Sequence, residues 1–316
     1  MQKADLIAHI APDILVLSGL DHDHGLATLT AFRDLITRQG HEFAHVFALP
    51  SNAGLLDRAE QVAPQRRRSP DDAQGYGHFR GERSLAILSR LPIDTTEARD
   101  FSAFLWRDLP GAKLPSVPPD RLSDQRLSST GHWDVPVLLD HDRKLHLLIY
   151  QAGPPVFGPG DGWNRNRNHD ETAFWLAYLD QRLPMTAPDA PVVLMGGSNL
   201  DPFDGDGLHQ AMRRVLDHPR LQDPQPTSKG AIDAATTEMD RAQSGPPERD
   251  TVHWPQPNGP GNLRVSYILP DARLSVRDAA VFWPSANDPD AALLGDPDEP
   301  PTRHRLVWVD LDLMPP

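Results

Sequence analysis

The sequence predicts an α/β fold in which two packed, mixed β-sheets are flanked by helices. Short apolar runs of strand length recur along the 316 residues, whereas few stretches have helical spacing. The 33 prolines imply stiff loops between short elements rather than a helical bundle or a repeat array. No glycine-rich turn of the kind that binds nucleotides is present, which argues against a doubly wound fold.

The expected strands are short and strongly apolar. The first, DILVLS at 13–18, is a continuous apolar run behind Pro12, which is typical of a strand buried on both faces. The other expected strands are 44–48, 85–89, 133–139, 145–150, 191–196, 263–269, 273–282 and 305–311.

Helical spacing is found at a few places between these strands. Residues 25–38 carry apolar side chains at helical intervals, and 207–216 predicts a further helix. For 168–181, Asn168 is expected as the N-cap because Glu171 follows three residues later. The polar, Pro- and Gly-rich stretch 223–261 is expected to be a long, partly disordered loop.

Composition limits the possible partners and locations. The formal net charge of −13 disfavours non-specific nucleic-acid binding, which relies on Lys and Arg at phosphates. The chain has no cysteine, no apolar run of membrane-spanning length and no leader as written. We therefore expect one domain over 1–316 with no membrane partner, in the cytoplasm as written, or in the periplasm or secreted if the true start lies upstream.

Several segments taken together resemble a known group of enzymes. They are PDILVLSGLDHD (12–23), SLAILSRLPI (84–93), PVVLMGGSNLDP (191–202) and RHRLVWVDL (303–311), supported by LHLLIYQAGPPVF, NRNRNHDE and NLRVSYILP. In this order they resemble the endonuclease/exonuclease/phosphatase superfamily. The resemblance implies a deoxyribonuclease I-like four-layer α/β sandwich and metal-dependent hydrolysis of phosphoesters. The family's first strand has no counterpart, since this chain starts at what looks like the following helix.

The positions that carry the family's chemistry are mostly changed. The family pattern implies a metal-holding glutamate, a histidine, an aspartate in Gly-Asp-x-Asn, a further carboxylate and an acid before the final histidine. This sequence has other residues at those places, in order Gly19, Gln151, Gly197, Ser266 and Arg303. Two positions match, Asn199 and His304, and these are the only catalytic remnants that the resemblance implies.

The expected consequence is a non-catalytic protein. Mg²⁺ is usually held by one or two carboxylates plus waters, so these changes remove the whole inner shell, and no cofactor is expected. Arg303 beside His304 should lower the imidazole pKa and attract anions. Gln151, Asn199, Arg303 and His304 are therefore expected to bind a phosphate-like anion, or the protein to bind a protein partner, without cleavage.

An active phosphoesterase with a rebuilt site is the alternative. Asp21, His22 and Asp23 form a dense group of potential ligands after Gly19, and with His169 they could hold Mg²⁺ or Mn²⁺. The competing interpretation is that the first group is a turn capping the next helix, and that His169 and Asp170 cap their own helix. Likewise, Asn199 could simply stabilise its turn, and His304 could be an ordinary polar residue.

Overall fold

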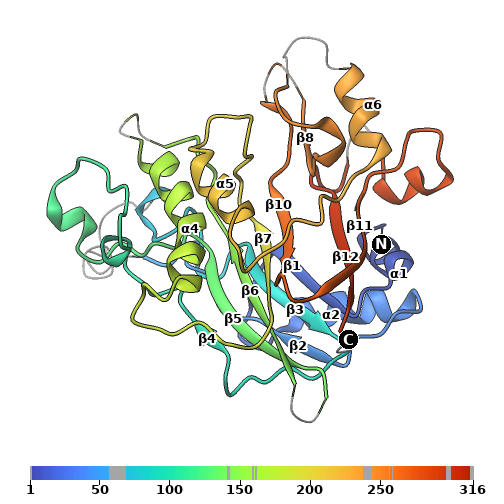
Figure 1. Ribbon diagram of the computed structural model, residues 1–316, viewed down its shortest axis with the longest axis horizontal. Coiled ribbons are helices and arrows are strands. Elements are labelled where there is room, and N and C mark those ends of the chain that lie inside the picture. The colour runs from blue at the N-terminus through green and yellow to red at the C-terminus, as the bar shows by residue number, and fades with distance from the viewer. Residues whose placement is uncertain are drawn as a thin grey trace.

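Two sheets pack face to face in the computed structural model, which describes residues 2–56, 69–140, 143–158, 160, 162–237, 243–255, 257, 259–296 and 300–313. The larger, five-stranded sheet has the order β10-β7-β6-β5-β4, with β4 at Arg99–Asp100, β5 at Gly131–Leu138, β6 at Lys144–Gln151, β7 at Val192–Gly197 and β10 at Ser266–Pro270. The smaller, three-stranded sheet has the order β1-β3-β2, with β1 at Ile14–Leu20, β2 at His45–Phe47 and β3 at Ser84–Ser89 (Figure 1).

Two hairpin-like pairs complete the strands. β11 (Ser275–Phe282) pairs with β12 (Leu306–Asp312), and β8 (Val252–Trp254) pairs with β9 (Gly261–Leu263). The α-helices are α1 (Gln2–Ile10), α2 (Ala27–Arg38), α4 (Trp163–Leu179), α5 (Gln210–Leu216) and α6 (Lys229–Thr237). Short 3-10 turns lie at Pro70–Asp72, Trp106–Asp108, Pro119–Leu122, Pro247–Arg249 and Pro289–Leu294.

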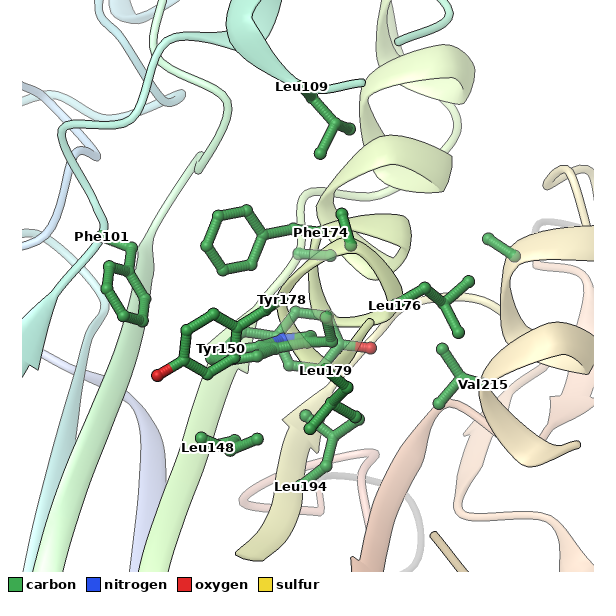
Figure 2. Packing of buried hydrophobic residues seen from close by; sticks show 14 of the residues in the cluster. Phe101, Leu109, Leu148, Tyr150, Phe174, Leu176, Tyr178, Leu179, Leu194 and Val215 are labelled. Atoms are coloured by element: carbon green, nitrogen blue, oxygen red, sulfur yellow. The ribbon is translucent and has the colours of Figure 1, made fainter. Parts of the chain in front are cut away.

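The three largest apolar clusters of the described residues form three apolar layers, which lie between four layers of structure. The middle layer joins the two sheets, where Leu85 and Ile87 of β3 meet buried side chains of β5, β6 and β7. A second layer packs α1 and α2 against β1 and β3. The third packs α4 and α5 against the outer face of the five-stranded sheet, and Figure 2 shows Phe174 and Tyr178 of α4 gathered there with Tyr150 and Leu194. Because β6 and β7 are covered on both faces, their continuous apolar sequences are explained.

Several expectations are corrected by the structure. Helix α4 begins at Trp163, after Gly162 in a left-handed conformation, so Asn168 is not the N-cap and His169 and Asp170 lie inside the helix. Asn168 instead uses its amide to donate to the carbonyls of Gly153 and Ser198.

The polar stretch 223–261 is also more structured than its composition predicts. It contains α6, a 3-10 turn at Pro247–Arg249 and β8. Residues 238–242, 256 and 258 of this stretch lie outside the described part of the chain. Among the described residues, no helix has the length and hydropathy needed to cross a bilayer.

Candidate functional site

Three of the changed positions lie side by side at the ends of adjacent strands. The register places Gln151 of β6 opposite Gly197 of β7, and Gly197 opposite Ser266 of β10. Asn199 follows two residues after Gly197, so its side chain joins the same edge of the five-stranded sheet. All four residues line one cavity of about 2790 Å³.

The same cavity is also lined by Gly19 and His304. Gly19 lies at an irregularity in the pairing of β1 with β3 and has a φ of 80°, which favours glycine. His304 precedes β12 and lines the same cavity. Segments far apart in the sequence therefore border one large cavity. The described residues at these positions are Gly19, Gln151, Gly197, Asn199, Ser266 and His304, and their side chains carry no carboxylate.

The two glycines at the end of β7 have different reasons to be there. A Cβ on Gly196, whose φ is 141°, would lie 1.9 Å from the backbone oxygen of Tyr150, so the fold itself requires glycine. A Cβ on Gly197 would lie 2.2 Å from Oε1 of Gln151. The amide of Gln151 thus fills the space into which a side chain at 197 would point, and the two changed positions fit one another.

The amide nitrogens at this edge are already engaged. Nδ2 of Asn199 donates to the carbonyl of Ala152 at 2.8 Å, and Nε2 of Gln151 donates to the same carbonyl at 3.2 Å. Asn199 adopts a left-handed φ of 49°, which asparagine tolerates better than most residues. Asn199 therefore ties the turn after β7 to the residue that follows β6, rather than bonding within its own turn.

His304 meets a cation, but not the one expected from the sequence. Its ring packs edge-on against Trp254 at a centroid distance of 5.5 Å. Desolvation lowers the pKa of His304, and the charge of Arg305 lowers it further. Because the pKa of His304 therefore lies below the usual histidine value of about 6.5, the imidazole is neutral at pH 7.

Arg305 lines the cavity, whereas Arg303 is exposed and is not among the described lining residues. The carbonyl of Arg303 accepts a hydrogen bond from the N–H of His253. Arg303 is therefore paired through its backbone with the segment of His253, outside the cavity. The expectation that Arg303 contributes to this pocket is therefore corrected to Arg305, which the sequence interpretation missed although it directly follows His304.

The Arg305 guanidinium stacks on Trp283 at 4.5 Å from the ring centroid. One of its Nη atoms donates to the carbonyls of Thr302 and Arg303, and its buried Nε has no hydrogen-bond partner in the described structure. Within that same described part, Arg305 forms no ion pair. Burial lowers the pKa of Arg305, but a guanidinium starts so high that it keeps its charge at neutral pH. The result is a positive group without a compensating acid beside His304.

The residues of the alternative metal site already take part in hydrogen bonds with neighbouring parts of the fold. Asp23 caps α2, because its carboxylate accepts the N–H groups of Gly25, Ala27 and Thr28. These bonds, led by those from Thr28 and Ala27, lower the pKa of Asp23 to about 2. Asp21 accepts the N–H of Arg83 at 3.0 Å.

The remaining members of that group lie elsewhere. The N–H of His22 donates to the carbonyl of Gly81. His169 is buried inside α4, where Nδ1 lies 2.8 Å from Oδ1 of Asp170, and Asp170 also accepts from Nε1 of Trp106 and the N–H of Lys113. Over the described residues, no three His, Cys, Asp or Glu side chains come together in a way that could hold a metal ion.

Buried charged residues of α4 hold the loops around the cavity. Glu171 accepts from the N–H and hydroxyl of Ser129 and from the N–H of Gly153, and burial raises its pKa. Arg167 donates to the backbone carbonyls of Gln74, Arg126, Leu127 and Ser128. Both residues line the cavity, but their polar atoms are used to fix the walls. These contacts could not be predicted from the sequence, because they join α4 to loops that are distant along the chain.

The arrangement of two packed sheets between helical layers, with a large cavity bordered by strands of both sheets, defines an α/β sandwich of the deoxyribonuclease I-like type. Residues 4–304 match the model of the endonuclease/exonuclease/phosphatase family, and the chain belongs to this family. No curated protein matches the chain.

Solved structures share this fold at low sequence identity. A family protein from Beutenbergia cavernae is 17% identical with a TM-score of 0.54, and the match covers 98% of this chain but only 65% of that one. A family protein from Leptotrichia buccalis is 12% identical with a TM-score of 0.52, and the match covers 99% of this chain and 92% of that one. A mannosyl-6-phosphatase from Bacteroides thetaiotaomicron is 14% identical with a TM-score of 0.50, and the match covers 99% of this chain and 91% of that one.

Proposed function

We propose that this protein keeps the family's scaffold but does not hydrolyse phosphoesters with a metal, and that its cavity binds a phosphate-like anion through His304 and Arg305. The observation that carries the proposal is the register that lines up Gln151, Gly197 and Ser266 at one edge of the sheet, in a cavity that Gly19 also lines. Four of the five positions to which the family pattern assigns acids or a histidine line this cavity, at Gly19, Gln151, Gly197 and Ser266, and none of these residues bears a negative charge.

The donor set does not fit a hard divalent cation. Mg²⁺ and Mn²⁺ prefer carboxylate and water oxygens, and amide, hydroxyl and glycine positions offer at best weak neutral ligands. Glu171 is the carboxylate that α4 contributes to the lining, and both of its oxygens already accept hydrogen bonds from Ser129 and Gly153. We therefore derive no catalytic step through a metal.

The same cavity is better suited to an anion. Arg305 supplies a permanent positive charge without an acidic partner in the described structure, and the neutral His304 ring can donate one N–H. The guanidinium is held in place by stacking on Trp283, so little side-chain freedom is lost when an anion binds.

Hydrolysis is tested with purified protein, Mg²⁺ or Mn²⁺, and two chromogenic substrates, p-nitrophenyl phosphate and bis(p-nitrophenyl) phosphate. Mannose 6-phosphate is added as a third substrate because one structural neighbour is named a mannosyl-6-phosphatase. We expect no metal-stimulated release of product. Metal-dependent turnover that disappears in His304→Ala would refute the proposal.

Anion binding is tested by titration calorimetry with inorganic phosphate. Loss of a charge-assisted contact predicts about 10-fold or greater weakening in Arg305→Ala. Arg303→Ala is the matched control, since Arg303 is exposed outside the cavity and its loss should leave affinity unchanged. Equal effects of the two substitutions would contradict the assignment to Arg305.

A further inference from the structure

A second set of side chains that line the cavity comes from loops and from α4 rather than from strand ends. Tyr76 lies in the loop before β3, Phe157 in the loop after β6, and Trp163 at the first position of α4. Arg107 and Arg121 lie in the 3-10 turns that follow β4. We call these five residues the aromatic rim. None of them belongs to the proposed anion pocket.

Phe157 is held in solvent by a braced loop. It is 91% exposed, and its φ of 68° is rare for a bulky residue. Two asparagines of α4 fix the loop, because Nδ2 of Asn164 donates to the carbonyl of Val156 and Nδ2 of Asn168 donates to the carbonyl of Gly153, both at 2.8 Å. An exposed ring contributes little packing to the fold, and backbone strain of this kind is found mostly where a ligand binds.

Trp163 and Arg121 form a stacked pair next to this loop. The guanidinium of Arg121 lies 5.2 Å from the centroid of the Trp163 ring, and Trp106 packs edge-on against the same ring at 5.3 Å between centroids. Trp106 is fully buried, and its Nε1 donates to Asp170. Arg121 is exposed and forms no ion pair within the described residues, so its N–H groups can donate to a ligand.

Tyr76 is connected to the same elements. It is 59% exposed, and two residues before it Gln74 donates from Nε2 to the carbonyl of Asp124 at 3.2 Å. The carbonyl of Gln74 accepts from Nη2 of Arg167 in α4 at 2.6 Å. The loops that carry Tyr76 and Arg121 are therefore joined to α4, and the rim is one surface.

The charges along this part of the cavity are balanced. Between 53 and 171, apart from the buried Arg167 and Glu171, the described lining residues include three arginines and three aspartates, and the amides of Gln125 and Asn164 lie among them. Acids on the rim disfavour a polyanion, whose affinity relies on positive charge. Hydroxyl groups suit such a mixture, because each can donate to a carboxylate or amide oxygen and accept from a guanidinium. The six charged residues are Asp71, Asp72, Arg83, Arg107, Arg121 and Asp124.

We propose that the aromatic rim binds a carbohydrate. The apolar faces of its sugar rings pack on the exposed rings of Phe157 and Tyr76, and Arg121 and the polar residues around it bond to the hydroxyl groups. Exposed aromatic rings beside planar polar side chains satisfy both the apolar and the polar surface of a sugar. This inference goes beyond the proposed anion pocket, because it requires no phosphate on the sugar.

The probe is a set of short neutral oligosaccharides immobilised on an array, to which the full chain is applied with a fluorescent label. We expect the wild-type chain to be retained by at least one of them. The oligosaccharide that retains it most strongly is then titrated in solution by calorimetry. Loss of one stacking ring should weaken this binding by about 3- to 10-fold in Phe157→Ala and in Tyr76→Ala, whereas Phe157→Tyr, which keeps a ring, should bind like the wild type.

Phe79→Ala is the matched control. Phe79 is 50% exposed in the same loop as Tyr76 but is not among the described lining residues, so its loss should leave the affinity for the oligosaccharide unchanged. Arg305→Ala should also leave it unchanged, and Phe157→Ala should leave the affinity for inorganic phosphate unchanged. Failure of the sugar site and failure of the anion pocket are thereby distinguishable.

Three results would overturn the proposal. The first is a wild-type chain that no neutral oligosaccharide retains. The second is binding that Phe157→Ala and Tyr76→Ala do not weaken more than Phe79→Ala does. The third is tight binding of a single-stranded oligonucleotide that Phe157→Ala abolishes, which would make the rim a nucleic-acid site.

Discussion

The glycine pair that ends β7 provides a quantitative test of the site geometry. At Gly196, alanine would place its Cβ 1.9 Å from the carbonyl oxygen of Tyr150, a backbone atom of the neighbouring strand that cannot rotate away. The φ of 141° adds strain of roughly 1–3 kcal/mol for a non-glycine residue. With the backbone displacement included, we expect Gly196→Ala to cost about 3 kcal/mol or more, a large part of the roughly 5–15 kcal/mol typical of domain stability.

At Gly197 the clash is with a side chain that can move. The Cβ would lie 2.2 Å from Oε1 of Gln151, the far end of a flexible amide. We expect Gly197→Ala to cost about 1 kcal/mol, and most of this cost to vanish in the Gln151→Ala background.

The assay is urea-induced unfolding of both single variants and of the double mutant, with the m-value checked for constancy. If Gly196→Ala and Gly197→Ala cost the same, the distinction between a fold requirement and a site requirement fails. If Gly197→Ala lowers the free energy of unfolding by the same amount in the Gln151→Ala background, the amide of Gln151 does not occupy the space at position 197.

Three further predictions concern other parts of the molecule. Burial raises the pKa of Asp250 to about 8, so the folded state holds its proton more tightly, and the free energy of unfolding should fall on the order of 1–3 kcal/mol as pH rises from about 5 to 8; Asp250→Asn should flatten this slope, and an unchanged slope in urea titrations would contradict the assignment. The cap on α2 lowers the pKa of Asp23 to about 2, so its stabilisation is present at neutral pH and is lost as pH falls from about 4 to 2; Asp23→Ala should lower Tm at pH 7, and a Tm deficit that persists undiminished at pH 2 would argue against the cap. Gly19→Glu has open space for its Cβ but a φ of 80°, so it should cost about 1–2 kcal/mol in urea unfolding and restore no metal-dependent hydrolysis by itself; measurable turnover in this variant would show that one carboxylate is enough.

The sequence predicted the strands of the sandwich well because buried strands have short, continuous apolar runs. The segments DILVLS and PVVLMGG contain β1 and β7, and the ends of β6, β7 and β10 lie side by side. The convergence of Gln151, Gly197 and Ser266 could be predicted because the segment order matched a known family.

Features that depend on tertiary contacts were not predictable in the same way. The choice between Arg303 and Arg305 depends on which residue of an irregular pairing turns toward the cavity. That pairing includes an isolated antiparallel bridge between Val252 and His304, which are distant in the sequence. The start of α4 was misjudged because Asn168 has the chemistry of a cap, while its actual partners, Gly153 and Ser198, are distant in the sequence.

Direct measurement of Mn²⁺ binding tests the central claim most simply, because free and bound Mn²⁺ are distinguished by electron paramagnetic resonance without any substrate. With the side chains at positions 19, 151, 197 and 266 supplying no carboxylate, we predict that the free-ion signal is unchanged by an equimolar amount of protein at about 0.1 mM. Loss of one equivalent of that signal, restored by His304→Ala or by Asp21→Ala, would contradict the claim.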